Sequence, residues 1–419
     1  MVDLKIFGKQ AKQAAKELAL LPTSKKNEVL LHLADLLEAN AEPILAANQF
    51  DVDEGEKNGL STALIDRLRI TPKRIIGMAA GVRNVASLED PVGLEFDTKL
   101  MSNGLKVRKQ RVPLGVLAVI YESRPNVTVD VASLALKSGN ALILRGGKET
   151  IQSNLALVEI VHQAMEACDI TKNSVQFIDD PDHALVNELL KMSEMIDMLI
   201  PRGSDRLQKF CRENSRIPVI TGGIGICHLF VDETADQEAS IDVIHNAKTQ
   251  RPSVCNALDT LLVHEAIAKE FIPQVVNRLT VDGVTVHVSA EVRNWFSEEQ
   301  DGMEICEDGD YDREWLSLNL GIKIVSDVQA AIAHVQEHST GHSDGILTGT
   351  KENAEQFVAT VDSATVYVNA STRFTDGSQL GLGAEVAIST QRLHARGPMA
   401  LEALTTYKWV IEGDYQVRS

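Results

Sequence analysis

The stretch that decides the fold is residues 115–121, which reads GVLAVIY and is apolar without interruption after its glycine. Further short apolar runs follow at 141–144, 175–178, 195–200, 219–221 and 227–231. Helical patterns lie between them at 129–137, 154–167, 184–192 and 205–213. Continuous apolar strands that alternate with helices predict a parallel sheet covered on both faces. The fold class is therefore α/β, with a doubly wound unit of the nucleotide-binding type.

Helical and α/β patterns extend to both sides of this unit. Residues 1–90 read as helical, with Pro43 and Pro72 as breakers. A second α/β pattern begins near residue 231, with a helix expected at 266–278 and strands at 285–288, 321–325 and 364–369. The acidic stretch 297–314 is expected to be a solvated surface loop. A chain of 419 residues thus has two or three domains.

Composition and charge exclude several classes of function. The formal net charge is −18, which disfavours nucleic acid or an anionic membrane as a partner. No apolar run approaches the ~18 residues that a membrane span needs, and residues 5–21 read as an amphipathic surface helix, not a signal peptide. The five cysteines include no C-x-x-C pair, and their odd number favours a reducing compartment and a cytoplasmic location.

Cys255 is the candidate nucleophile. It lies in residues 249–260, TQRPSVCNALDT, a polar loop that leads into a strand-like run. Because Pro252 stops any helix before it, the thiol should be presented to a substrate. An inert thiol remains the alternative. The other cysteines are expected to be structural, at positions 168, 211, 227 and 306.

Three glycine-containing segments follow strands and suggest phosphate binding. They are residues 201–205 (PRGSD), 144–149 (LRGGKE) and 221–225 (TGGIG). The first also opens a helix, whose N–H groups could hold a pyrophosphate together with Ser204. No G-x-G-x-x-G motif opens the first strand. Each segment alone is ordinary turn chemistry, but three at the carboxyl ends of parallel strands predict a nucleotide site.

Five blocks in this sequence resemble the aldehyde dehydrogenase superfamily. They are 119–128 (VIYESRPNVT), 251–257 (RPSVCNA), 341–344 (GHSD), 368–377 (VNASTRFTDG) and 381–385 (GLGAE). Within the superfamily, the chain is similar to the branch that reduces L-glutamyl 5-phosphate. The resemblance implies a cofactor-binding domain at 1–98 and 113–223, a catalytic domain at 224–392, and a small β-flap at 99–112 and 405–419. The flap implies a homo-oligomer, a dimer or a tetramer.

The resemblance also assigns roles to single residues. Cys255 matches the nucleophile, and Asn126 matches the asparagine whose amide forms the oxyanion hole with the backbone N–H at the cysteine. The cofactor-binding residues implied are Arg145, Lys148, Gly203, Ser204, Gly222, Gly223 and Glu314. The substrate-binding residues expected are Arg124, Arg251, Ser253 and Arg373, because an arginine fork suits a phosphate.

Simpler interpretations of these residues stay open. Asn126 could be a turn residue after Pro125. The side chains of Arg124 and Arg373 could form surface ion pairs. Solvated positions are the alternative for Arg145, Lys148 and Glu314.

Together the residues and the resemblance lead to one expected reaction. NADPH reduces L-glutamyl 5-phosphate to L-glutamate 5-semialdehyde through a Cys255 thioester, with release of phosphate, as the second step of proline biosynthesis from glutamate. Residues 220–223 read ITGG, without the glutamate with which ordinary aldehyde dehydrogenases hydrolyse the acyl-enzyme. An ordinary NAD(P)-dependent aldehyde dehydrogenase and a non-catalytic nucleotide-binding protein are the alternatives.

Partners and metals complete the expectations. The acyl phosphate must come from a separate glutamate kinase, and contact between the two proteins is conceivable. His334, His338 and His342 recur every four residues, as metal ligands on a helix do. Because residues 339–341 (STG) should end that helix, no metal site is expected.

Overall fold

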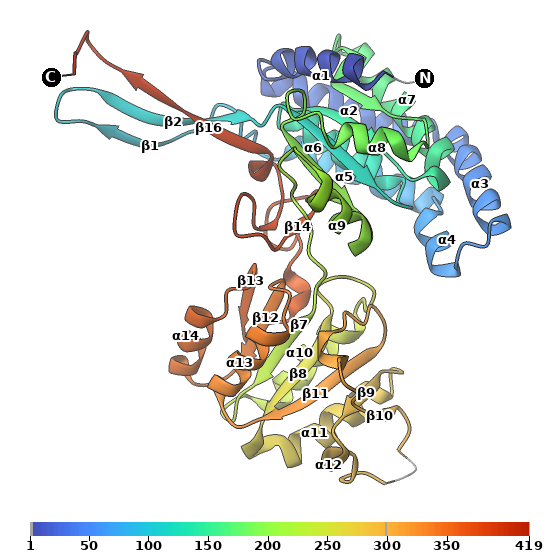
Figure 1. The fold of residues 1–419 in the computed structure, drawn as a ribbon, viewed down its shortest axis with the longest axis vertical. Helices are drawn as coiled ribbons and strands as arrows, with labels where there is room; N and C mark the ends of the chain where they lie inside the picture. The colour runs from blue at the N-terminus through green and yellow to red at the C-terminus, as the bar shows by residue number, and fades with distance from the viewer. Residues whose placement is uncertain (1–2, 298–299, 419) are drawn as a thin grey trace. The chain divides into compact units, whose positions relative to one another are not determined.

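Two parallel sheets form the centres of two compact units in the computed structural model, which describes residues 3–297 and 300–418 (Figure 1). The first unit comprises Met1–Thr221, Gly381–Ala387 and Met399–Ser419, and the second comprises Gly222–Leu380 and Ile388–Pro398. The chain therefore leaves the first unit, builds most of the second, and returns twice.

The sheet of the first unit has the order β5-β4-β3-β6, and all neighbouring strands are parallel. Its strands are β3 (Val116–Tyr121), β4 (Ala141–Arg145), β5 (Val175–Phe177) and β6 (Met198–Arg202). This order confirms the doubly wound sheet, because the chain winds one way from β3 to β5 and then reverses to β6. The reversal creates a topological switch point between β3 and β6, where such sheets bind ligands.

One expected strand of this sheet is missing. Residues 219–221 form no strand in the structure, where only Val219 makes a single parallel bridge to Leu199. The prediction of a strand there was wrong, because the apolar run is too short to pair beyond one residue. The other apolar runs became strands within a few residues of their expected bounds.

Helices cover the sheet of the first unit and form its N-terminal part. They are α1 (Leu4–Leu18), α2 (Thr23–Ala39), α3 (Ala41–Lys57), α4 (Thr62–Leu68), α5 (Pro72–Ser87), α6 (Asn126–Lys137), α7 (Ile151–Ala167), α8 (His183–Leu189) and α9 (Asp205–Asn214). Their starts follow capping chemistry: Thr71 caps α5, with Pro72 in the first turn. Ser204 caps α9.

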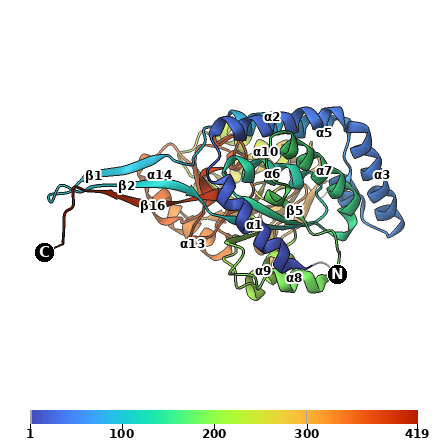
Figure 2. The ribbon, with the colours of Figure 1, turned by 90° about the horizontal axis from the view of Figure 1, so that it is seen from above.

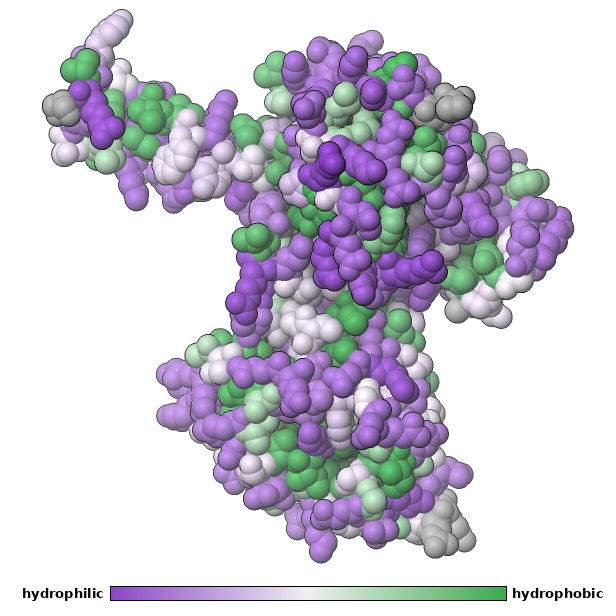
Figure 3. Space-filling view, in the orientation of Figure 1, coloured by the Kyte–Doolittle hydropathy of each residue, from purple (hydrophilic) through white to green (hydrophobic). Residues whose placement is uncertain are grey.

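A three-stranded antiparallel flap projects from the first unit as an arm (Figures 1 and 2). Its order is β1-β2-β16, with β1 at Glu95–Leu100, β2 at Lys106–Pro113 and β16 at Thr405–Glu412. Tyr407, Trp409 and Ile411 alternate along β16, share one face and are exposed. Figure 3 accordingly shows apolar surface on the arm.

The second unit has a seven-stranded sheet in which every neighbouring pair is parallel, with the order β10-β9-β11-β8-β7-β12-β13. Its strands are β7 (Cys227–Val231), β8 (Leu258–His264), β9 (Thr285–Val288), β10 (Met303–Ile305), β11 (Asn319–Val325), β12 (Ser343–Leu347) and β13 (Thr365–Val368). A further pair, β14 (Ile388–Ser389) and β15 (Gly397–Pro398), is antiparallel.

The acidic stretch 297–314 is more than a surface loop. Residues 303–305 form edge strand β10 beside β9, and the Asp310 side chain is buried. The expectation of a loop was therefore wrong at β10, and that of a solvated position was wrong at Asp310, whereas every other described residue of the stretch is exposed or half-buried. The carboxylate of Asp310 accepts the Glu307 N–H, and local hydrogen bonding of this kind lets an acidic residue be buried.

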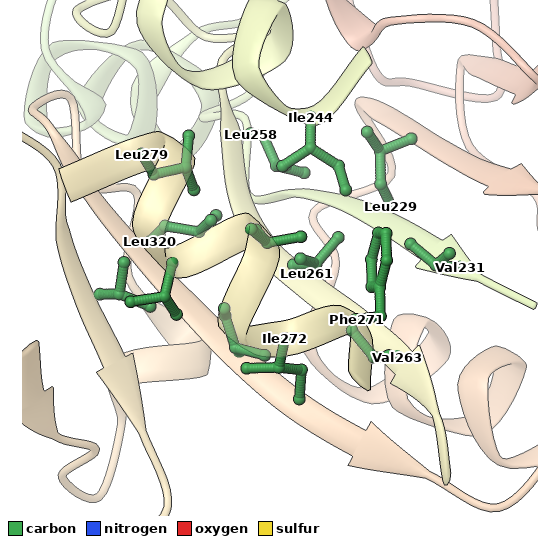
Figure 4. Packing of buried hydrophobic residues seen from close by; sticks show 14 of the residues in the cluster. Leu229, Val231, Ile244, Leu258, Leu261, Val263, Phe271, Ile272, Leu279 and Leu320 are labelled. Carbon is green, nitrogen blue, oxygen red and sulfur yellow. The ribbon is translucent and has the colours of Figure 1, made fainter. Parts of the chain in front are cut away.

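Both faces of the second sheet are packed. Leu229 and Leu261 belong to a cluster with Ile244 of α10 and Phe271 of α11 (Figure 4), whereas Phe230 belongs to a second cluster. Neighbouring residues of one strand point to opposite faces, so Leu229 and Phe230 of β7 are both buried although they face different clusters. The helices of this unit are α10 (Gln237–Thr249), α11 (Glu265–Thr280), α12 (Ala290–Arg293), α13 (Val328–His338) and α14 (Lys351–Thr360).

Across residues 3–297 and 300–418, no helix combines the length and the apolar character that crossing a bilayer requires.

Candidate active site

Cys255 lies in an irregular turn between α10 and β8, at the amino edge of the second sheet. Cys255 is half-buried, and Ser253, two residues before it, is exposed. The expected presentation of this thiol in a loop is confirmed. Cys168, Cys211 and Cys227, in contrast, are buried.

A glycine packs directly behind the nucleophile. A Cβ added to Gly225 would lie 1.6 Å from the carbonyl oxygen of Cys255, so no side chain fits at this position. The Gly225 N–H in turn donates to the carboxylate of Glu314 at 2.9 Å. Glu314 is half-buried, so the solvated alternative for this residue does not describe its position.

Cys227 holds the same carbonyl group from the interior. Its thiol donates to the Cys255 carbonyl oxygen at 3.2 Å, and the Cys227 side chain has no exposed surface. Burial raises the pKa of the Cys227 thiol well above its ordinary value, so the proton stays on this donor. Gly225 and Cys227 thereby fix the backbone at Cys255. Gly225 has no side chain that could react, and the Cys227 thiol stays protonated.

Two arginines flank the thiol within the second unit. Arg373 is half-buried, and its Nε–H donates to the Gln250 side-chain oxygen at 2.8 Å, whereas Arg251 is exposed. Burial, followed by the neighbouring Arg251 guanidinium, lowers the pKa of Arg373, and Cys255 acts in the opposite direction. These effects mean that Arg373 lies within electrostatic range of both the Cys255 sulfur and the Arg251 guanidinium. Two arginines held near each other suit an anionic ligand.

The first unit holds an anion at the start of α9. At the switch point between β3 and β6, the Glu122 carboxylate accepts the Ser204 N–H at 2.7 Å and the Ser204 hydroxyl at 3.1 Å. A Cβ at Gly203 would lie 2.3 Å from a Glu122 oxygen. The predicted pyrophosphate site is therefore a set of donors that already binds a carboxylate of this chain.

Of the two cations predicted at the adenosine ribose, one is buried and one is exposed. The Arg145 guanidinium donates to the Pro181 carbonyl oxygen at 2.8 Å and to the Gly146 carbonyl oxygen, and burial lowers its pKa. Lys148 is exposed. The carboxylate of Glu149, the residue after Lys148, accepts the N–H and the hydroxyl of Ser123 at 2.9 and 2.6 Å.

Asn126 is the first residue of α6, so the simpler interpretation as a turn residue is not what the structure shows. Its amide nitrogen donates to the Asp130 carboxylate one helical turn later at 2.8 Å, and burial raises the pKa of Asp130 to about 6. Both Asn126 and Arg124 are exposed in the first unit.

The glycine pair predicted for cofactor binding lies at the beginning of the second unit. Gly222 makes an antiparallel bridge to Ser389. A Cβ on Gly223 would lie 2.6 Å from the Thr390 hydroxyl oxygen. The pair thus packs against residues 389–390 and does not form an open loop.

The histidine series ends as expected. α13 stops at His338, and His342 lies beyond it, directly before β12. In the described part of the chain, no group of histidine, cysteine or acidic side chains is arranged to hold a metal ion.

Comparison with known proteins identifies the family of this arrangement. The model of the aldehyde dehydrogenase family matches residues 2–287. The chain belongs to the aldehyde dehydrogenase family. It is 55% identical over 417 residues to the γ-glutamyl phosphate reductase of Psychromonas ingrahamii and 56% identical over 419 residues to that of Yersinia enterocolitica, with 100% of each chain covered. The crystal structure of the Thermotoga maritima γ-glutamyl phosphate reductase matches with a TM-score of 0.96 at 44% identity, covering 100% of both chains.

The aldehyde dehydrogenase resemblance found in the sequence is thereby confirmed, together with the fold class. Sequence reasoning missed three residues that shape the site: Cys227, Glu122 and Asn256. Asn256 is buried and immediately follows Cys255. Its place beside the candidate nucleophile was the signal in the sequence that could have identified it. Nothing in the sequence indicated that Glu122 reaches the start of α9.

Proposed function

We propose that this chain catalyses the NADPH-dependent reduction of L-glutamyl 5-phosphate to L-glutamate 5-semialdehyde, the second step of proline biosynthesis from glutamate. The proposal is supported by relatives that are named for this reaction and match over their full length. The structural observation that carries it is the half-buried Cys255 thiol within electrostatic range of Arg373, which in turn neighbours Arg251.

The chemistry begins at Cys255. Its thiolate attacks the γ-acyl carbon, the carbon–oxygen bond to the phosphate breaks, and a thioester forms as inorganic phosphate leaves. Arg251 and Arg373 favour the thiolate and receive the leaving phosphate, because both processes concentrate negative charge beside the sulfur. Arg124 and Ser253 remain proposed contacts to the substrate.

An oxyanion forms at the substrate carbonyl when the thiolate adds. Asn126 is the proposed side-chain donor to this oxygen, on the family resemblance. Its amide has a second N–H besides the one donated to Asp130. Loss of one such donor lowers kcat by about 100- to 1,000-fold in other enzymes.

The first unit fits a dinucleotide at its switch point. The Ser204 donors bind the Glu122 carboxylate, which shows that the start of α9 accepts an anion. Gly203, Ser204 and the exposed Lys148 are the residues we propose for the phosphates, with Arg145 beneath them, while Gly222, Gly223 and Glu314 remain proposed cofactor contacts. When bound, the reduced nicotinamide supplies the hydride that converts the thioester into the aldehyde.

The closest alternative is an ordinary aldehyde dehydrogenase that releases a free acid. That reaction needs a base to activate water at the thioester. The segment Ile220–Gly223 has no carboxylate, which favours transfer to phosphate over hydrolysis.

The deciding experiment runs the reaction backwards. NADP reduction by glutamate 5-semialdehyde is measured with and without inorganic phosphate, for the wild type and for Cys255→Ser. We expect oxidation only when phosphate is present, and loss of kcat by several orders of magnitude in the variant. Phosphate-independent formation of glutamate would instead identify an ordinary aldehyde dehydrogenase.

The proposal includes the setting of the reaction. The substrate is expected from a separate kinase, and we place both reactions in the cytoplasm because the odd cysteine count suits a reducing compartment. The apolar face of β16 makes the flap our proposed contact between copies of the chain.

A further inference from the structure

Asn256 joins the nucleophile turn to a segment that lies more than 100 residues later in the chain. Its amide nitrogen donates to the Thr375 carbonyl oxygen at 3.0 Å and to the Arg373 carbonyl oxygen at 3.3 Å. The hydroxyl of Thr372 donates to the Asn256 carbonyl oxygen at 2.7 Å. The side chain of Asn256 is 3% exposed, so water offers little substitute for these bonds.

No regular sheet pairing performs this connection. Residues 372–374 form a single 3-10 turn beyond β13, and Cys255 and Asn256 precede β8. β8 and β13 are separated in the sheet by β7 and β12. The hydrogen bonds of Asn256 are therefore a direct link between the two segments, which the sheet joins only through two intervening strands.

The residue at the far end of this link is Arg373. Its backbone carbonyl is held by Asn256, and its side chain donates to Gln250, five residues before Cys255 in the same loop. On the other side, the Cys255 carbonyl is held by Cys227 and backed by Gly225. The Asn256 amide thus holds the backbone of the 372–375 segment, while the bonds from Thr372 to the Asn256 carbonyl and from Arg373 to Gln250 join the same two segments.

We propose that Asn256 is a positioning residue that keeps Arg373 at a fixed place relative to the Cys255 sulfur, so that the arginine can receive the phosphate. This inference rests on the proposed function, in which Arg373 contacts the leaving group. Displacement of a binding group by about 1 Å can cost roughly 100-fold in rate. Asn256 therefore acts through Arg373 and touches no reacting atom.

The chemistry of the amide explains why asparagine suits the position. Two carbonyl oxygens need two N–H donors on one short side chain, and an amide nitrogen supplies both. The Asn256 Oδ1 atom has no hydrogen-bond partner within the described residues, so within this side chain the nitrogen alone contributes to the link. Aspartate has the same shape without these donors, and alanine removes the group altogether.

A double-mutant cycle tests the inference. KM for inorganic phosphate and kcat are measured in the oxidation of glutamate 5-semialdehyde for Asn256→Ala, Asn256→Asp, Arg373→Gln and the double variant Asn256→Ala with Arg373→Gln. We expect Asn256→Ala to raise KM for phosphate at least about tenfold, and Asn256→Asp to raise it at least as much. In the Arg373→Gln background, Asn256→Ala should change KM less than about twofold, because the residue through which it acts has gone.

A second readout separates positioning from general damage. At pH 9, where the thiolate forms without help from Arg373, the rate at which iodoacetamide alkylates Cys255 should stay within about threefold of the wild type, since Cys227 and Gly225 still hold the Cys255 backbone. At pH 6–7 the rate should fall no further than it does in Arg373→Gln, because Asn256 acts through that arginine. The matched control is Asn353→Ala in the same unit, whose amide donates to Asp232 at 3.2 Å, and it should leave KM for phosphate unchanged.

The outcomes are distinguishable. Independent, multiplying effects in the double variant, or a loss of Cys255 alkylation at pH 9, overturn the positioning role while the proposed function stands. If wild-type oxidation is independent of phosphate, the proposed function fails and the inference fails with it.

Discussion

Gly225 shows how a single missing side chain fixes the backbone of the proposed nucleophile. The 1.6 Å separation between an added Cβ and the Cys255 oxygen is far below any tolerated contact. The neighbour that would have to move is backbone, which is also held by Cys227. Glycine is required here for close approach, not for an unusual backbone angle.

Gly225→Ala is therefore expected to shift the nucleophile turn. We expect a loss of unfolding free energy of about 1–3 kcal/mol or more, together with a lower rate of Cys255 alkylation by iodoacetamide. Chemical unfolding and alkylation kinetics measure the two effects.

The control is Gly81→Ala in the middle of α5. Apart from its own helix, no described heavy atom lies within 4 Å of a Cβ added there. This substitution should be stabilising by about 1 kcal/mol, because alanine is the better helix former. Equal effects of the two substitutions would show that the close approach at Gly225 is unimportant.

At the scale of elements, the start of α9 is shared between a carboxylate of the chain and the proposed phosphate of the cofactor. Glu122 must release the Ser204 donors before another anion can take them. Removal of its charge lowers the electrostatic competition, and the neutral amide accepts hydrogen bonds less strongly. In the wild type, the Glu122 carboxylate would therefore compete with the cofactor phosphate for the Ser204 donors and weaken cofactor binding.

Glu122→Gln is expected to lower KM for NADPH several-fold without a matching change in kcat. Steady-state kinetics at constant ionic strength measure this effect. Glu188→Gln removes one exposed carboxylate from α8 and serves as the charge-matched control. A raised KM in the Glu122 variant would mean that this carboxylate contacts the cofactor instead.

The elements differ in how far the sequence predicts them. Residues 116–121 were recognisable as a strand because burial on both faces leaves an unbroken apolar run. β10 was not, because an edge strand in an acidic stretch carries no such run. A strand of three residues is set by its neighbour β9 and not by its own composition.

The residues of the candidate site also differ in how far the sequence predicts them. Cys255 was identified from its loop and from the family blocks around it. The link through Asn256 and the carboxylate of Glu122 depend on partners at Thr375 and Ser204, and such distant pairs leave no local pattern. The nucleophilic role of Cys255 therefore stays a prediction from the sequence, whereas the contacts that hold its turn had no local signal.

For the molecule as a whole, buried histidines make stability depend on pH. Burial lowers the pKa of His342 to about 4 and that of His334 to about 2. An unfolded histidine titrates near 6.5, so between pH 6.5 and 4 the unfolded state binds more protons than the folded one. The stabilisation is complete above pH 6.5 and is lost as the pH falls towards 4.

His342→Gln should reduce this dependence. The difference between 6.5 and about 4 corresponds to about 3 kcal/mol of unfolding free energy across that interval. Urea unfolding at several pH values measures the slope, with the exposed His183→Gln as the control. Comparison with the wild type isolates the histidine from groups such as Asp259, whose pKa burial raises to about 7 and whose effect has the opposite sign. An unchanged slope would contradict the burial argument.

The arm predicts how the chain behaves in solution. An apolar face of Tyr407, Trp409 and Ile411 is expected to be covered by a second copy. The wild type should therefore have a mass that is a multiple of 45.8 kDa in light scattering. The double variant Trp409→Lys with Ile411→Lys should dissociate to that mass, whereas Thr406→Lys on the opposite face should not.

Because the strands of the arm lie far apart in the sequence, the arm can be completed only late in synthesis. β2 is finished at residue 113, but its partner β16 begins only at residue 405. At a ribosomal speed of about 5–20 residues per second, the two are made roughly 15–60 s apart. Until then β1 and β2 form a lone hairpin, which is marginally stable in water. If the arm joins copies of the chain, as proposed, a nascent chain has no finished arm to offer to a neighbour on the same messenger RNA until residue 412 has been made.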